Sequence, residues 1–149
     1  QYRVIEEKFR DHENVEVKNM ALSDQKGMAT FNYVPDFPAY SGFKKRDYPD
    51  KSPEIKEIDV DTNLLDNVVP EDMKVDFIKV DVEGAEYLVL KGAKNILKQS
   101  FPVIVFEFGL GASEYYNTTP EKIFNFFHQY DYGIWLIDEF IKGSPPRWT

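Results

Sequence analysis

The chain has no cysteine and only two histidines among its 149 residues. The absence of cysteine excludes disulfides, thiolate nucleophiles and cysteine-ligated zinc, and two histidines are too few for an imidazole metal cage. Basic residues are also fewer than acidic ones, since the chain has 18 Lys and Arg but 26 Asp and Glu, which gives a net charge of −8. Binding to a nucleic-acid backbone needs a basic face, so no nucleic-acid partner is expected.

Long apolar runs are absent as well. No stretch approaches the ~20 apolar residues that cross a membrane, and the opening QYRVIEEKFRD is a charged amphipathic run rather than a signal peptide. We therefore expect a soluble, cytoplasmic protein without a membrane partner. The length and the 42% hydrophobic content suit one domain over residues 1–149 with a buried core, and they leave the oligomeric state open.

The first half of the chain carries short periodic segments and one long loop. Helical spacing predicts the tail of a helix over residues 1–11, and alternation predicts strands over 15–21 and 28–34 that pair as a hairpin. The loop 35–53 is too long for a plain connector. After it the pattern indicates a short strand over 54–60 and then a short helix or turn over 63–69.

The second half alternates between strand and helix patterns. The expected elements are a strand over 76–82, a helix over 85–99, a strand over 103–108, a helix from Thr119 and a strand over 134–138. Strands that alternate with helices in this way are typical of an α/β fold with parallel, right-handed βαβ connections.

The first of these strands carries an unusual set of charges, since VDFIKVDVEG places Lys79, Asp81 and Glu83 at every second position and so on one face. Asp81 and Glu83 fall where this strand ends, and Glu107 falls where strand 103–108 ends. Ligands of open α/β sheets bind outside the carboxyl ends of the strands. We therefore expect these three carboxylates to converge on one edge of the sheet, called here the carboxylate rim.

Lys79 is expected to be mostly buried and paired with Asp81, because an unpaired buried ion costs several kcal/mol. Asp81 and Glu83 would then face a cleft. A purely structural cluster, in which Glu83 or Glu86 caps the next helix, is an equally open interpretation.

The residues also resemble a known family. VDFIKVDVEGAEYLVLKGA at 75–93, followed by PVIVFEFG, is similar to the central signature of the FkbM-type methyltransferases. Three further segments, NMALSDQKG, AYSGFKKR and IDVDT, resemble the family's intervening segments, so the resemblance covers nearly the whole chain. It implies S-adenosyl-L-methionine as cofactor, a Rossmann-like methyltransferase sheet with helices on both faces, and methyl transfer to a hydroxyl oxygen of a small molecule or sugar.

The family binds the methionine end of its cofactor with a glycine-rich turn after the first strand, and the ribose with an acidic residue after the second. Neither feature occurs in this sequence. The resemblance therefore implies the carboxyl-terminal part of the domain, without its first two strands. The strand that begins at residue 15 should then not pair with strand 76–82, and the chain alone should not bind S-adenosylmethionine.

The resemblance also implies roles for particular residues. Ala21, Leu22 and Ser23 follow the strand that is third in the full fold, where related enzymes border the adenine; a plain hairpin turn is the alternative. Asp81 lies where related enzymes place an acidic residue near the transferred methyl group and the acceptor.

A carboxylate at the position of Asp81 can remove the proton of the acceptor hydroxyl or hold a divalent cation. Glu83 and Glu107 are expected to orient the acceptor or a metal, with a structural role as the alternative for each. Oxygen ligands favour magnesium or calcium over zinc. A divalent cation is possible but not expected, and no metal ligand is assigned.

Two alternatives concern larger parts of the chain. The basic triplet Lys44-Lys45-Arg46, flanked by aromatic residues, suits either a lid that meets an acidic or sugar acceptor or a solvated loop with packed aromatics. For the whole chain, the alternative to an enzyme is a non-catalytic fragment or interaction module that retains the acceptor-side half of a methyltransferase fold.

Overall fold

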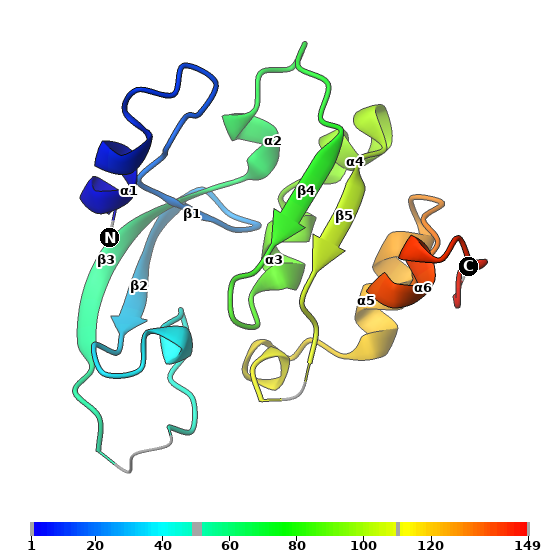
Figure 1. Cartoon of the computed structure of the whole chain (residues 1–149). Coiled ribbons are helices and arrows are strands. Elements are labelled where there is room, and N and C mark those ends of the chain that lie inside the picture. Colours follow the sequence, from blue (N-terminus) through cyan, green and yellow to red (C-terminus); the bar gives the residue numbers. More distant parts are fainter. Residues whose placement is uncertain (1, 49–51, 110, 149) are drawn as a thin grey trace.

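The computed structural model describes residues 2–48, 52–109 and 111–148. Within them the chain is a mixed α/β arrangement with two small sheets (Figure 1). The elements in chain order are α1 (Tyr2–Phe9), β1 (Ala21–Leu22), β2 (Gly27–Tyr33), the 3-10 helix η1 (Pro38–Tyr40), β3 (Lys56–Asn63), α2 (Leu65–Val68), β4 (Phe77–Val80), α3 (Glu86–Lys91), α4 (Lys94–Ser100), β5 (Val103–Phe106), the 3-10 helix η2 (Ser113–Tyr116), α5 (Pro120–His128) and α6 (Ile137–Ile141).

The first sheet has the order β1-β3-β2, with β3 in the centre. β2 runs antiparallel to β3, from the pair Gly27 and Thr62 to the pair Tyr33 and Lys56, whereas β1 is parallel to β3. The hairpin predicted between strands 15–21 and 28–34 is therefore wrong. Glu16 and Lys18 form an exposed ion pair with each other, so the segment before β1 buries no face that would hold it in a strand.

The second sheet consists of β4 and β5, which are parallel and in register from Phe77 and Val103 to Val80 and Phe106. Both strands were predicted from the sequence, although each is shorter than expected. Their parallel pairing confirms a βαβ unit, because the chain passes through α3 and α4 between them. β1 and β4 belong to different sheets and are not hydrogen-bonded to each other.

The helix predicted over residues 85–99 is divided into α3 and α4 at Gly92 and Ala93. A Cβ atom on Gly92 would lie 2.2 Å from the carbonyl oxygen of Ser23, so the first sheet approaches this point more closely than any side chain allows. The N–H of Gly92 donates to the carbonyl groups of Leu88 and Val89, at 3.2 and 3.0 Å, which ends α3. Tertiary contact thus overrides a continuous helical pattern.

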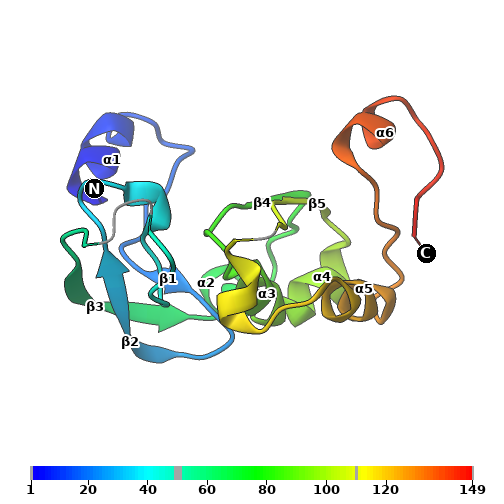
Figure 2. The ribbon, with the colours of Figure 1, turned by 90° about the horizontal axis from the view of Figure 1, so that it is seen from below.

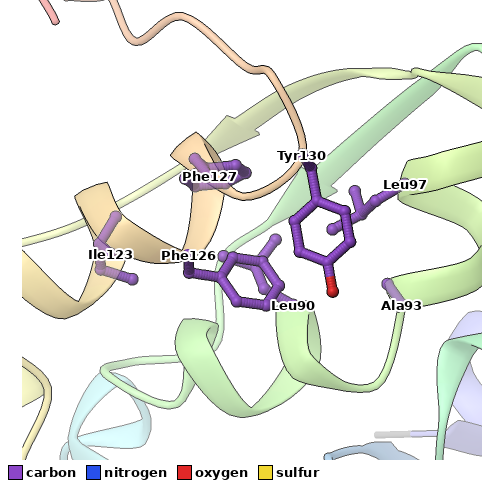
Figure 3. Close-up of a cluster of buried hydrophobic side chains, with 7 residues drawn as sticks. All are labelled: Leu90, Ala93, Leu97, Ile123, Phe126, Phe127 and Tyr130. Carbon is purple, nitrogen blue, oxygen red and sulfur yellow. The ribbon is translucent and has the colours of Figure 1, made fainter. Parts of the chain in front are cut away.

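Helices α3, α4 and α5 cover one face of β4 and β5, as Figure 2 shows from below. Their apolar side chains form the main core, which Figure 3 shows in close-up: Leu90, Ala93, Leu97, Ile123, Phe126, Phe127 and Tyr130. Ile104 and Phe106 of β5 pack against this cluster. Because alternate residues of a strand point to opposite faces, these strands bury one side only.

The opposite face of this sheet is open among the described residues, since Phe77 is 58% and Val103 is 45% exposed. The expectation of helices on both faces is therefore not met for β4 and β5. The strand predicted over 134–138 is also wrong, because Ile137 begins the helix α6 and Ile134 forms only an isolated bridge with Trp148. Asp138 and Glu139 occupy the first turn of α6, where acidic side chains favour a helix. None of the described helices is both long enough and apolar enough to cross a membrane.

The start of α4 depends on a carboxylate from α2. Asp66 accepts hydrogen bonds from the N–H groups of Asn95 and Ile96, at 2.9 and 3.0 Å. We expect Asp66→Ala to lower the free energy of unfolding by about 1–2 kcal/mol, because two helix-terminal donors lose a charged acceptor. Urea denaturation measures this change. Asp72→Ala, in the exposed loop before β4, is the control, and an equal loss in both variants would contradict the capping role.

Candidate functional site

Three loops meet at the carboxyl ends of β4 and β5. They are the turn 81–85 after β4, the segment 107–117 after β5, and the loop 34–48 between β2 and β3 (Figure 1). A small cavity of about 50 Å³ lies between the first two. It is lined by Glu83, Gly84, Glu86, Glu107, Gly109, Ala112 and Ser113. The structure therefore brings two of the three predicted rim carboxylates, Glu83 and Glu107, to one cavity.

Asp81 is exposed and does not line this cavity. Its Oδ2 lies 2.5 Å from the Nζ of Lys79, so the predicted pair is present. The predicted burial of Lys79 is wrong, because its side chain is 61% exposed. Lys79 projects from the open face of β4, where water solvates the ammonium group and the cost of burying an ion does not arise. Such an exposed pair contributes about 1 kcal/mol or less to stability.

The turn after β4 is held by a buried carboxylate that the sequence did not single out for the site. Glu86 is 3% exposed, and its Oε1 accepts hydrogen bonds from the N–H groups of Val82 and Gly84, both at 3.1 Å. Glu86 thus binds the turn that precedes α3. Its place in the first helical turn, two residues after a glycine, was the signal for this role.

Glu83 and Gly84 occupy backbone conformations that L-residues rarely adopt. The φ angle is 56° at Glu83 and 102° at Gly84. A Cβ atom on Gly84 would lie 2.6 Å from the carbonyl carbon and oxygen of Ala112. Because no side chain fits there, the loop after β5 packs directly on the turn after β4. Unusual backbone geometry of this kind clusters at functional sites.

The loop 34–48 is fastened to the segment after β5 by two tyrosines. The N–H of Phe43 donates to the Tyr116 hydroxyl at 3.1 Å, and the N–H of Asp47 donates to the Tyr115 hydroxyl at 3.0 Å. Burial raises the pKa of Tyr116 above its ordinary value. The loop is therefore tied down at two points beside the rim.

The three residues of the basic triplet in this loop differ in their exposure to solvent. Lys44 and Lys45 are exposed, whereas Arg46 is buried. Aromatic rings of the loop pack on neighbours, with centroids 5.9 Å apart for Phe31 and Phe43 and 6.3 Å apart for Tyr40 and Tyr48. Residues 49–51 of the predicted loop lie outside the described residues. The described part of this loop therefore contains packed aromatic rings.

Arg46 reaches the rim itself. One of its terminal nitrogens, Nη2, lies 3.5 Å from Oε2 of Glu83 and donates to the carbonyl oxygen of Ala39 at 2.6 Å. Its guanidinium lies 5.3 Å from the ring centroid of Tyr40. Sequence analysis did not distinguish Arg46 from the neighbouring lysines, and no local pattern marks it as the buried member.

The residues predicted to border the adenine lie elsewhere. Ala21 and Leu22 form β1, and the N–H of Ser23 donates to the carbonyl of Asn63 at 2.9 Å. Ser23 is buried against Gly92, beyond the carboxyl end of α3, whereas Glu86 at the rim begins that helix. Ala21, Leu22 and Ser23 therefore do not line the cavity of Glu83 and Glu107.

A larger cavity of about 360 Å³ lies along β5, between the end of α5 and α6. Its walls include Phe101, Val103, Val105, Phe106, Phe127, Tyr132, Ile134, Trp135, Ile137 and Phe140. The hydroxyl of Tyr132 is buried and has no hydrogen-bond partner in the part of the chain that the structure describes, and burial raises its pKa to about 12. None of the six predicted site residues lines this cavity.

These cavities bear on whether the described residues fit S-adenosylmethionine. Pockets for molecules of that size measure about 300–1,000 Å³ and carry polar groups that fix the ligand. The cavity at the rim is too small, and the larger one is mainly apolar, with Asp131 as its one charged lining residue. Neither of these two cavities therefore suits the whole cofactor. No group of three or more His, Asp or Glu within these residues is placed to hold a metal ion.

In open α/β sheets, ligands bind outside the carboxyl ends of the parallel strands, which is where the rim lies in this chain. The chain matches the methyltransferase FkbM domain over residues 2–134, and it belongs to that family. The resemblance noted in the sequence is thereby confirmed, and membership implies a Rossmann-like methyltransferase fold. Comparisons with curated proteins and with solved structures found no match.

The contact between the two rim loops is testable at Gly84. We expect Gly84→Ala to lower the free energy of unfolding by at least about 2 kcal/mol, because the methyl group meets the backbone of Ala112 and the φ angle is unfavourable. Gly109→Ala is a matched control, since Gly109 lines the same cavity but has open space at its Cβ position. Equal stability of the two variants in urea denaturation would show that the loops do not pack as described.

Proposed function

We propose that this chain is the acceptor-side part of an S-adenosyl-L-methionine-dependent O-methyltransferase that acts in the cytoplasm on a hydroxyl group of a small molecule or sugar. The observation that carries the proposal is the family match over residues 2–134, in a chain whose parallel strands end at a rim of carboxylates. A hydroxyl nucleophile needs a nearby base, and accessible carboxylates supply one.

Asp81 is the proposed general base. It lies directly after β4, is exposed, and has Lys79 as its ion-pair partner. An oxygen of its carboxylate would accept the proton of the acceptor hydroxyl as that oxygen becomes a nucleophile. Lys79 would help to orient the carboxylate, because its Nζ lies 2.5 Å from the Oδ2 atom of Asp81.

Glu83 and Glu107 are proposed to orient the acceptor. Both line the cavity of about 50 Å³, which has room for a group of about the size of a hydroxyl or a water molecule. Carboxylate oxygens accept hydrogen bonds from hydroxyl groups, so a polyhydroxylated acceptor such as a sugar matches this lining. A divalent cation is not part of the proposal.

The cofactor of this family supplies the methyl group when it is bound. We propose that Ala21, Leu22 and Ser23 border its adenine, as the family resemblance suggests, with Ser23 as the polar side chain. Because neither of the two cavities suits the whole cofactor, we propose that its remaining contacts come from outside the described residues.

A non-catalytic module is the second candidate. It is favoured by one observation, the open face of β4 and β5 that carries Phe77 and Val103. An exposed apolar sheet face is typical of surfaces that bind another protein segment. Incubation of the complete protein with a small-molecule extract and isotopically labelled S-adenosylmethionine separates the candidates, because mass spectrometry detects labelled product only for the enzyme.

The proposed base gives a kinetic prediction. In the complete protein, Asp81→Asn should lower turnover by about a hundredfold or more, which is typical for the loss of a positioned base. Asp76→Asn, an exposed carboxylate just before the other end of β4, should retain normal turnover. Near-normal turnover of Asp81→Asn in the same assay would make Asp81 structural.

The 149-residue chain by itself should not bind S-adenosylmethionine. The basis is the lack of a glycine-rich turn in the sequence and the poor fit of the two cavities to the cofactor, one being too small and the other mainly apolar. Isothermal titration of the purified chain with the cofactor should give no heat of binding at micromolar concentrations. Micromolar affinity would show that the cofactor site lies within these residues.

A further inference from the structure

Arg46 is a cation buried beside the rim. Its side chain is 5% exposed, although it comes from an irregular loop and its two neighbours in the basic triplet point to solvent. An arginine side chain also loses about 2 kcal/mol of rotamer entropy when it is held in one place. A buried, ordered guanidinium must therefore be compensated by specific contacts.

Those contacts hold the guanidinium from three directions. The carbonyl oxygen of Ala39 accepts from Nη2, and the ring of Tyr40 lies beneath the guanidinium. Within the described chain, Glu83 is the carboxylate within ion-pair distance of Arg46. The Nε atom is buried and finds no hydrogen-bond partner among the described residues. Arg46 is thus fixed by the loop and presents its charge to the rim.

The side chain of Glu83 is half-exposed, in contrast to the buried side chain of Arg46. Its backbone is fixed by the hydrogen bonds of Glu86 to the two flanking N–H groups, but its side chain is 41% exposed and lines the small cavity. A half-exposed glutamate on a rigid backbone samples several rotamers unless a partner selects one. The fixed guanidinium group of Arg46 is placed to select one rotamer of Glu83.

We propose that Arg46 is a positioning residue of the acceptor site, which holds the Glu83 carboxylate in the one orientation that binds the acceptor hydroxyl. This inference rests on the proposed function and deepens it by adding a residue from a distant loop. A carboxylate accepts about four hydrogen bonds, so Glu83 retains acceptor capacity while it pairs with Arg46. Arg46 acts through Glu83 and does not touch the acceptor itself.

A double-mutant cycle tests the pairing without any need for activity. Unfolding equilibrium constants are measured in urea for the complete protein and for Arg46→Met, Glu83→Gln and the double variant. We expect a coupling of at least about fivefold between Arg46 and Glu83. The exposed pair of Lys74 and Asp76, at 3.0 Å, is the control and should give about twofold or less with Lys74→Met and Asp76→Asn. Independent effects of Arg46→Met and Glu83→Gln would overturn the proposal.

A kinetic experiment separates positioning from simple stabilisation. Labelled S-adenosylmethionine and a small-molecule extract serve as probes, and the extract is diluted to find the concentration that gives half-maximal methyl transfer. Arg46→Met should raise this concentration about tenfold, because acceptor binding weakens, while the half-saturating cofactor concentration stays within about twofold of the wild-type value. Arg46→Lys should recover part of the loss, since an ammonium group keeps the charge but not the planar donor geometry.

Two results would contradict the role in acceptor binding. One is an unchanged half-saturating extract concentration in Arg46→Met, and the other is an equal weakening for extract and cofactor, which would indicate general damage to the fold. If the wild-type protein transfers no label, the proposed function fails together with the acceptor role. The unfolding cycle still decides whether Arg46 fixes Glu83, so the two failures are distinguishable.

Discussion

The geometry of the rim depends on the bonds that the buried carboxylate of Glu86 makes to the turn after β4. One oxygen of Glu86 accepts from Val82 and Gly84, which fixes a turn with positive φ angles at two successive residues. Such a conformation persists only where surrounding contacts determine it. Gly84 then lies against Ala112, and Glu83 lies beside Arg46. The loop after β5, through Ala112, and the loop 34–48, through Arg46, are therefore both positioned by this one turn.

A second constraint joins the two sheets. The carbonyl oxygen of Ser23 approaches Gly92 so closely that α3 ends there, and next to this contact Asp24 pairs with Lys91. Close backbone approach needs a glycine, and the partly buried ion pair of Asp24 and Lys91 beside it joins the same two segments. The helix break is thus the point at which the first half of the chain is attached to the second. The rim and the predicted adenine-bordering residues lie at opposite ends of α3 because of it.

The sequence was informative where a local pattern and the tertiary environment agreed. β5 and α5 were predicted because their apolar residues face one common core. β4 pairs in parallel with β5, which brings Glu83 and Glu107 to one cavity, whereas Asp81 does not line it. The errors arose where the deciding contact is distant in sequence. The pairing of β2 with β3 and the break at Gly92 depend on neighbours that periodicity does not reveal. The helix α6 is an exception, because the acidic residues of its first turn are a local signal. Lys79 was expected to be buried because the sheet was assumed to be covered on both faces. Arg46 was not distinguished from its neighbouring lysines, because the burial of one cation in a loop leaves no local pattern in the sequence.

The acidic residues near the rim differ in how much of their hydrogen-bonding capacity the fold already uses. Glu86 is buried, and its Oε1 atom accepts from two backbone N–H groups, so this oxygen contributes to structure. Glu83 pairs with one buried cation and keeps a half-exposed side chain, and Asp81 pairs only with an exposed lysine. A carboxylate that exchanges protons with an acceptor must be reachable and must not serve as the main acceptor of a backbone turn. By that criterion Asp81 is the carboxylate that we propose for the chemistry, and Glu83 and Glu107 are those that we propose for orientation of the acceptor. Glu86 holds the backbone of the turn, and Arg46 pairs with Glu83.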